Sequence, residues 1–148
     1  MTNFQRVKAW LQACDKTPSP ATLSLQIGCD IEETVEFLRC LRTDKEGYGK
    51  LLERCISDLD WFAGKLKSGE AVAYIPPHLR VDALDAICDR EVTGNGVAYL
   101  AGFEKDGADT EVLRSNDSKL VDGKPVLLPG GKIGKGPNYT PPDLTKFI

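Results

Sequence analysis

Side chains that bind zinc are scarce in this sequence. It contains a single histidine, His78, and five cysteines, of which no two lie closer than eleven residues. Zinc centres and redox-active dithiols need closely spaced cysteines or several histidines. The composition therefore argues against both, and the cysteines are expected to be reduced thiols of an intracellular protein.

Long apolar runs are also absent. No segment approaches the roughly 18 apolar residues that a membrane-spanning helix needs. The first residues, MTNFQRVKAWLQACDK, have a polar side chain every few positions and lack the apolar centre of a signal peptide. We therefore expect a cytoplasmic protein that does not associate with a membrane.

Charge is unevenly distributed along the 148 residues, whose net charge is −3. Acidic residues are in excess as far as residue 111, and basic residues are in excess from there to the end of the chain. An acidic body argues against general nucleic-acid binding. It suits a carboxylate-rich metal site with cations nearby for an anionic substrate.

Hydrophobic residues recur at helical spacing over the first two thirds of the chain. The pattern predicts helices over residues 3–13, 21–41, 48–67 and 78–101, with Ser19 as an N-cap, Pro20 in the first turn, and Gly28 allowing close packing. Residues 102–148 are rich in glycine and proline, and 124–128 with 132–135 are typical of a short hairpin. The expected architecture is all-α: one domain with a helical catalytic body (1–102) and an extended C-terminal arm (103–148).

Two predicted helices carry clusters of carboxylates. Glu32, Glu33 and Glu36 crowd one face of the second helix, and Asp82, Asp85 and Asp89 follow one another by about a turn in the fourth. Either cluster alone is typical of a solvated helix face. Leu84, Ile87 and Cys88 suggest that the second cluster borders the core. If the clusters face each other, they form an all-oxygen pocket suited to Mg²⁺ or Mn²⁺.

A Mg²⁺ ion held by carboxylates, with few other reactive side chains nearby, is typical of enzymes that act on phosphate groups. There is no GxxxxGK[ST] motif, which excludes a P-loop enzyme. A carboxylate that is not fully used as a metal ligand can accept the proton of an attacking water. Arg114, Lys119, Lys132 and Lys135 are the candidate cations for the β- and γ-phosphates.

These motifs resemble a known family. The EExxE run, the later LDAICD segment, EVLRSNDSK at 111–119, DGKP at 122–125 and GKIGKGPNYTPPDL at 131–144 look like the MazG and phosphoribosyl-ATP pyrophosphatase type, in its small phage-associated form. The resemblance implies a four-to-five-helix bundle that forms a homodimer or homotetramer, in the host cytoplasm if the gene is a phage's. It implies hydrolysis of a (deoxy)nucleoside triphosphate to monophosphate and pyrophosphate, with purine deoxynucleotides such as dGTP weakly favoured.

The resemblance also implies roles for residues. Glu32, Glu33 and Glu36 are the expected catalytic and metal-binding set, and Asn116, Lys119 and Tyr139 are expected near the substrate. The second acidic set departs from the usual Glu-x-x-Asp, because Ala86 stands where Glu is expected if Asp89 is the final ligand. The alternatives are Asp82 with Asp85, or Asp85 with Asp89; the second is favoured, with Asp82 as a ligand of a second metal or of the substrate. Two other functions stay open, namely a non-catalytic nucleotide- or protein-binding module and a pyrophosphatase for another nucleotide.

Overall fold

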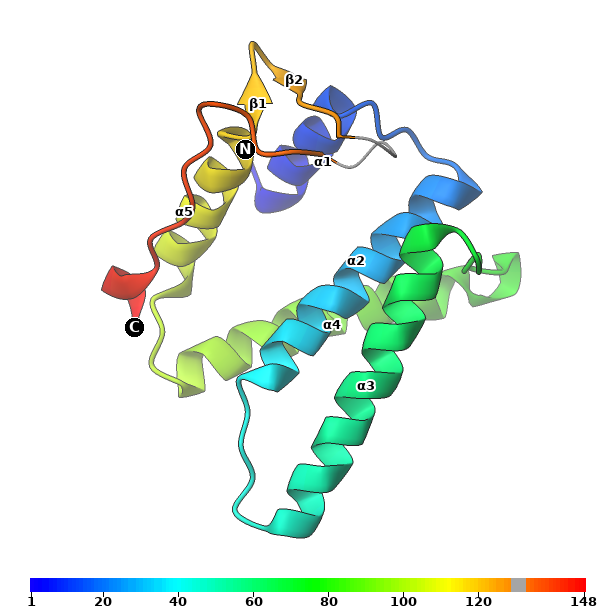
Figure 1. Cartoon of the computed structure of the whole chain (residues 1–148), viewed down its shortest axis with the longest axis vertical. Helices are drawn as coiled ribbons and strands as arrows, with labels where there is room; N and C mark the ends of the chain where they lie inside the picture. Colours follow the sequence, from blue (N-terminus) through cyan, green and yellow to red (C-terminus); the bar gives the residue numbers. More distant parts are fainter. Residues whose placement is uncertain (129–132) are drawn as a thin grey trace. The chain divides into compact units, whose positions relative to one another are not determined.

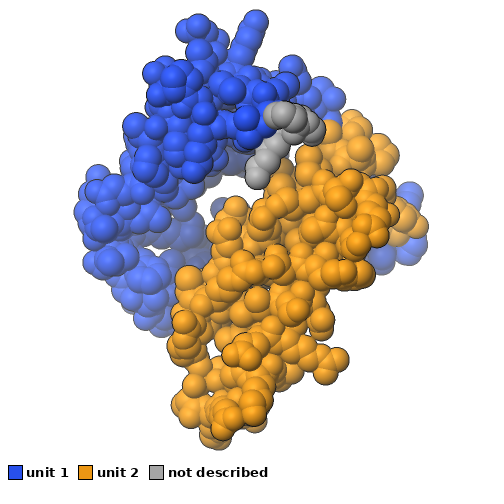
Figure 2. Space-filling model, viewed as in Figure 1, with its two compact units in different colours: residues 1–17, 77–148 blue, residues 18–76 orange. Residues whose placement is uncertain are grey.

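The structure, a computed structural model, describes residues 1–128 and 133–148. Within these residues it is mostly helical, and its strands are two residues long, so the expected all-α class is confirmed. The chain divides into two compact units (Figure 2). One unit is residues 18–76, and the other combines residues 1–17 with 77–148. The predicted boundary between body and arm stays a prediction.

A helical hairpin makes up residues 18–76 (Figure 1). Helix α2 covers Pro20–Arg39 and helix α3 covers Glu46–Ser68, and the two run antiparallel. Ser19 caps α2 as predicted, because its hydroxyl accepts the backbone N–H of Thr22. Helix α3 ends at Gly69, whose φ of 77° suits a residue without a Cβ.

Small residues let α2 and α3 approach closely. A Cβ placed on Gly28 would lie 3.1 Å from both the carbonyl oxygen of Ala63 and the Cβ of Leu66. Val35 on the same side of α2 is completely buried. The close packing expected at Gly28 is therefore present, and it fixes how α3 lies along α2.

The other unit begins with helix α1, Asn3–Ala13, at its predicted bounds. It continues after the hairpin with the short η1, Pro77–Leu79, helix α4, Arg80–Leu100, and helix α5, Lys105–Asp117. The indole N–H of Trp10 donates to the backbone oxygen of Asn116 at 3.1 Å, and Arg6 pairs with Asp117 at 3.2 Å. These contacts join α1 to α5 across most of the sequence.

Helix α5 was not predicted, because its residues lack a clear apolar stripe. It is followed by strands β1, Leu120–Val121, and β2, Lys124–Pro125, which pair in antiparallel register. The turn between them is Asp122–Gly123, both at positive φ, as a two-residue hairpin requires. The predicted hairpin further along is present in part as a bridge between Leu127 and Ile133, while Lys132 lies outside the described residues.

The C-terminal residues run back along α5 to η2, Thr145–Phe147 (Figure 1). Ser115 donates its hydroxyl to the Thr140 carbonyl at 2.9 Å, and the Glu104 N–H donates to the Phe147 carbonyl at 2.9 Å. The described residues of the predicted arm, 103–128 and 133–148, therefore pack within this unit. In the part of the chain that the structure describes, no helix has the length and apolar character needed to cross a bilayer.

Candidate functional site

The EExxE run lies in the second half of α2. Glu33 and Glu36 are exposed, and Glu32 is half-buried beside α3. The Lys67 ammonium of α3 contacts the Glu32 carboxylate, with 2.5 Å between Nζ and Oε1. Among residues 1–128 and 133–148, the Glu36 carboxylate has no hydrogen-bond or ion-pair partner. Glu36 is thus an available oxygen donor one turn from Glu32.

Two ion pairs flank Glu36 along the seam between the helices. Lys67 of α3 pairs with Glu32 of α2, and Arg39 of α2 pairs with Asp60 of α3 at 2.7 Å. Glu36 lies between Glu32 and Arg39 in the sequence of α2, and its side chain is exposed. It therefore has on either side, along α2, a residue that is engaged in an ion pair with α3.

The second acidic set lies on α4. Asp82, Asp85 and Asp89 are exposed, and none of their carboxylates has a hydrogen-bond or ion-pair partner within the described residues. The expectation that this face borders the core is wrong for the described chain, since Leu84 is 63% exposed and Ile87 58%. Within its own unit, α4 contacts chiefly η1 and α5, which leaves its middle uncovered.

Arg114, an expected phosphate ligand, is engaged within its own unit. Its guanidinium donates twice to the carboxylate of Glu111, at 2.8 Å each, and also to the Thr140 hydroxyl at 2.5 Å and the Pro141 carbonyl at 3.2 Å. Hydrogen bonds from Arg114 and from the Asp143 N–H lower the pKa of Glu111 to about 2. Arg114 therefore holds the C-terminal segment against α5, with most of its donors in use.

Other expected substrate ligands also contact one another. The Lys119 ammonium donates to the side-chain oxygen of Asn116 at 2.8 Å. Lys135 lies over the ring of Tyr139, 4.7 Å from its centroid, in a cation–π contact. The structure therefore brings Asn116 and Lys119 together at the C-terminal end of α5, whereas the partners of Arg114 are other residues. Lys132 lies outside the described residues.

The donor chemistry of the acidic sets fits a hard divalent cation. Every side chain in them is a carboxylate, which Mg²⁺ and Mn²⁺ prefer. Nowhere in the described ranges, however, do three or more His, Cys, Asp or Glu side chains gather closely enough to hold an ion. The Glu and Asp sets belong to different compact units, so each is described on its own helix.

Comparison with known proteins identifies no relative of this chain. The chain matches no family model, no curated protein and no solved structure. The expected kinship with MazG-type enzymes therefore rests on the motifs in the sequence, and the chemistry must be argued from the chain's own residues.

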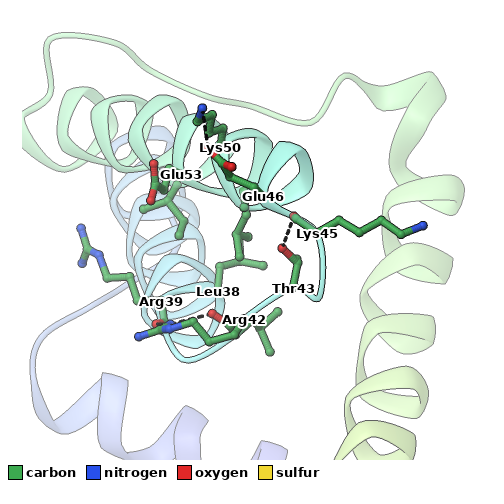
Figure 3. Close-up of a pocket in the computed structure, with 12 residues that line it drawn as sticks. Leu38, Arg39, Arg42, Thr43, Lys45, Glu46, Lys50 and Glu53 are labelled. Atoms are coloured by element: carbon green, nitrogen blue, oxygen red, sulfur yellow. Dashed lines mark hydrogen bonds and ion pairs between the residues drawn. The ribbon is translucent and has the colours of Figure 1, made fainter.

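Sequence reasoning did not anticipate a cavity of about 650 Å³ at the end of the α2–α3 hairpin where the connecting residues join the two helices (Figure 3). Arg39, Arg42 and Lys50 line it, yet each already has a partner: Asp60, backbone carbonyls and Glu46, respectively. Lys45 extends away from the other labelled side chains. Carboxylates therefore neutralise Arg39 and Lys50 but not Arg42, and the lining of the cavity begins at Leu38, two residues beyond Glu36. The complete lining is Leu38, Arg39, Leu41, Arg42, Thr43, Lys45, Glu46, Gly49, Lys50, Leu52, Glu53 and Ile56.

Proposed function

We propose that this protein is a metal-dependent nucleoside triphosphate pyrophosphohydrolase. The observation that carries the proposal is Glu36, an unpartnered carboxylate within the described residues, one turn from Glu32 on helix α2. Such a pair is a natural starting point for a hard-cation site. The resemblance to MazG-type enzymes supplies the reaction, which converts a (deoxy)nucleoside triphosphate to monophosphate and pyrophosphate.

The chain's own residues take the following roles in the proposal. Bound Mg²⁺ or Mn²⁺ supplies Lewis-acid chemistry and lowers the pKa of water. A carboxylate of the α2 set accepts the proton of the attacking water. Lys119, Lys132 and Lys135 bind phosphate oxygens, and Asn116 and Tyr139 contact the nucleotide. The proposed metal ligands are Glu32, Glu33, Glu36, Asp82, Asp85 and Asp89.

A second copy of the chain forms part of the proposal. Val81 is 79% exposed, Val92 69% and Leu100 83%, an amount of apolar surface that a helix does not usually leave in water. Burying such a face against a symmetric copy yields a homodimer or homotetramer, as the resemblance implies. A purine deoxynucleotide such as dGTP is the substrate we test first.

Incubation of each dNTP and NTP with Mg²⁺ or Mn²⁺, followed by separation of the products, tests the reaction. We expect monophosphate and pyrophosphate in equal amounts. Glu36→Ala should lower kcat by about 100-fold or more, as loss of a general base or metal ligand does. Glu53→Ala, which removes an exposed carboxylate of α3 outside both acidic sets, is the matched control and should retain activity. Full activity in Glu36→Ala contradicts the proposal.

One observation favours a non-catalytic nucleotide- or protein-binding module. Among the described residues no three metal-ligating side chains are brought together. If this alternative holds, no nucleotide is hydrolysed and Mn²⁺ leaves the melting temperature unchanged, whereas specific metal binding raises it. Cleavage of a phosphoribosyl-nucleotide or a nucleotide second messenger, with none of the triphosphates, identifies the other alternative.

A further inference from the structure

The cavity at the end of the α2–α3 hairpin has an apolar lining. It lies entirely within the compact unit of residues 18–76, and its volume is about 650 Å³. Leu38 of α2 and both Leu52 and Ile56 of α3 line it, and each of the three side chains is half-buried. Volumes of about 300–1,000 Å³, with apolar walls and a few polar groups, are typical of sites for small ligands.

Arg42 adds an available anion-binding group to this lining. Its Nη1 donates to the carbonyl oxygens of Arg39 and Leu41, at 2.9 and 2.6 Å, which holds the guanidinium against the end of α2. Among the described residues, its Nε and Nη2 have no hydrogen-bond or ion-pair partner. Together these two groups form the edge of a guanidinium that binds two oxygens of a carboxylate or phosphate in parallel.

The charges of the lining favour an anionic ligand over a cationic one. Four cationic and two acidic side chains line the cavity. Arg39 and Lys50 are already paired with carboxylates, and Lys45 extends away from the other labelled side chains (Figure 3). Glu53 is the unpaired carboxylate of the lining within residues 1–128 and 133–148, and Figure 3 shows it on α3, apart from Arg42.

We propose that this cavity binds a small amphipathic anion, which carries a carboxylate or phosphate group on an apolar body. The anionic group binds the Nε–Nη2 edge of Arg42, and the apolar body lies against Leu38, Leu52 and Ile56. A neutral apolar ligand would leave the Arg42 edge unused, and a purely ionic ligand would leave the apolar lining in water. The site is separate from the proposed metal-dependent reaction, because no residue of either acidic set belongs to the lining.

Titration of the ¹⁵N-labelled full chain with octanoate tests the site, with octanol as the uncharged probe of the same length. Octanoate should shift the backbone amide resonances of the cavity residues. Arg42→Met should weaken octanoate binding about fivefold, the effect of losing one exposed charge contact, and should leave octanol binding unchanged. Glu53→Gln should tighten octanoate binding by about twofold, because it removes a like charge from the lining.

Arg54→Met is the matched control. It removes an exposed arginine of α3 that lies outside the lining and whose Nε is 3.8 Å from Asp58, so octanoate binding should not change. Because Arg42 also bonds the last carbonyls of α2, circular dichroism checks that Arg42→Met keeps its helix content. A salt series on the unmodified protein needs no variant: at about 1 M salt, where the Debye length is about 3 Å, octanoate binding should weaken and octanol binding should not.

Three results overturn the inference. The first is that octanoate shifts no amide resonance of the cavity residues. The second is that octanoate and octanol bind the unmodified protein equally well at low salt. The third is that Arg42→Met and Arg54→Met weaken octanoate binding to the same extent.

Discussion

Gly28 offers a direct test of how the α2–α3 hairpin is packed. In an exposed helix interior, Gly→Ala stabilises the folded state by about 1 kcal/mol. At Gly28 the added Cβ would lie 2.9 Å from Lys67 Cγ and 3.1 Å from the Ala63 carbonyl oxygen. The first atom belongs to a flexible side chain, but the second belongs to the backbone of α3, so the helices themselves must separate.

Two opposing contributions set the expected change in the free energy of unfolding of Gly28→Ala. Overpacking of a close contact costs about 1–3 kcal/mol, and the helix propensity of alanine offsets about 1 kcal/mol of that. We therefore expect Gly28→Ala to lower the free energy of unfolding by about 0–2 kcal/mol. Gly64→Ala, at a helical position of α3 with open space around it, should raise the free energy of unfolding by about 1 kcal/mol.

Urea denaturation followed by circular dichroism measures both variants against the unmodified chain, with the midpoints compared at a common slope. The separation between the two variants, about 1–3 kcal/mol, is the informative quantity because helix propensity contributes equally to both. If Gly28→Ala is stabilised as much as Gly64→Ala, then α2 and α3 do not approach as closely as the structure shows.

Three further results are expected. Val35→Ala removes two methyl groups from a completely buried side chain and should lower the free energy of unfolding by about 2–3 kcal/mol in the same urea assay. Gly107→Ala should release the C-terminal residues, because its Cβ would overlap the Phe147 ring; faster proteolysis at the C-terminus detects the release. Stability should fall on acidification from about pH 4.5 towards pH 2, because the pKa of Glu111 is lowered on folding. In thermal melts across that range, Glu111→Gln should show a smaller decrease.

The elements with strong local signals were predictable from sequence. Helix α1 has its predicted bounds, and the Ser19 cap with Pro20 placed the start of α2 within a residue. Helix α5 was missed because its inner face is made of small and polar residues, of which Ser115 is the buried one. Helix α5 is stabilised by tertiary contacts such as the hydrogen bond from the Trp10 indole. Such contacts do not produce the helical spacing of apolar residues that sequence patterns detect. The Asp122–Gly123 pair was a usable turn signal for β1 and β2.

The candidate site was predictable in its chemistry and not in its contacts. The residues of the EExxE run are identifiable by spacing alone. That Lys67 holds Glu32 depends on the relative rotation of two helices and on Gly28, which no local pattern specifies. The engagement of Arg114 likewise depends on Thr140 and Pro141, which are far along the chain. Contacts between residues far apart in the sequence therefore decide which candidate ligands are already paired and which are available.

The bond from Trp10 to the backbone of Asn116 spans 106 positions, and this separation has a consequence for the order of folding. Contacts within the α2–α3 hairpin are local by comparison, and local contacts form with a smaller loss of chain entropy. During synthesis, α1 emerges first and must wait until α5 has been made before it can dock. Trp10, which is half-buried in the folded protein, therefore stays exposed until α5 is available.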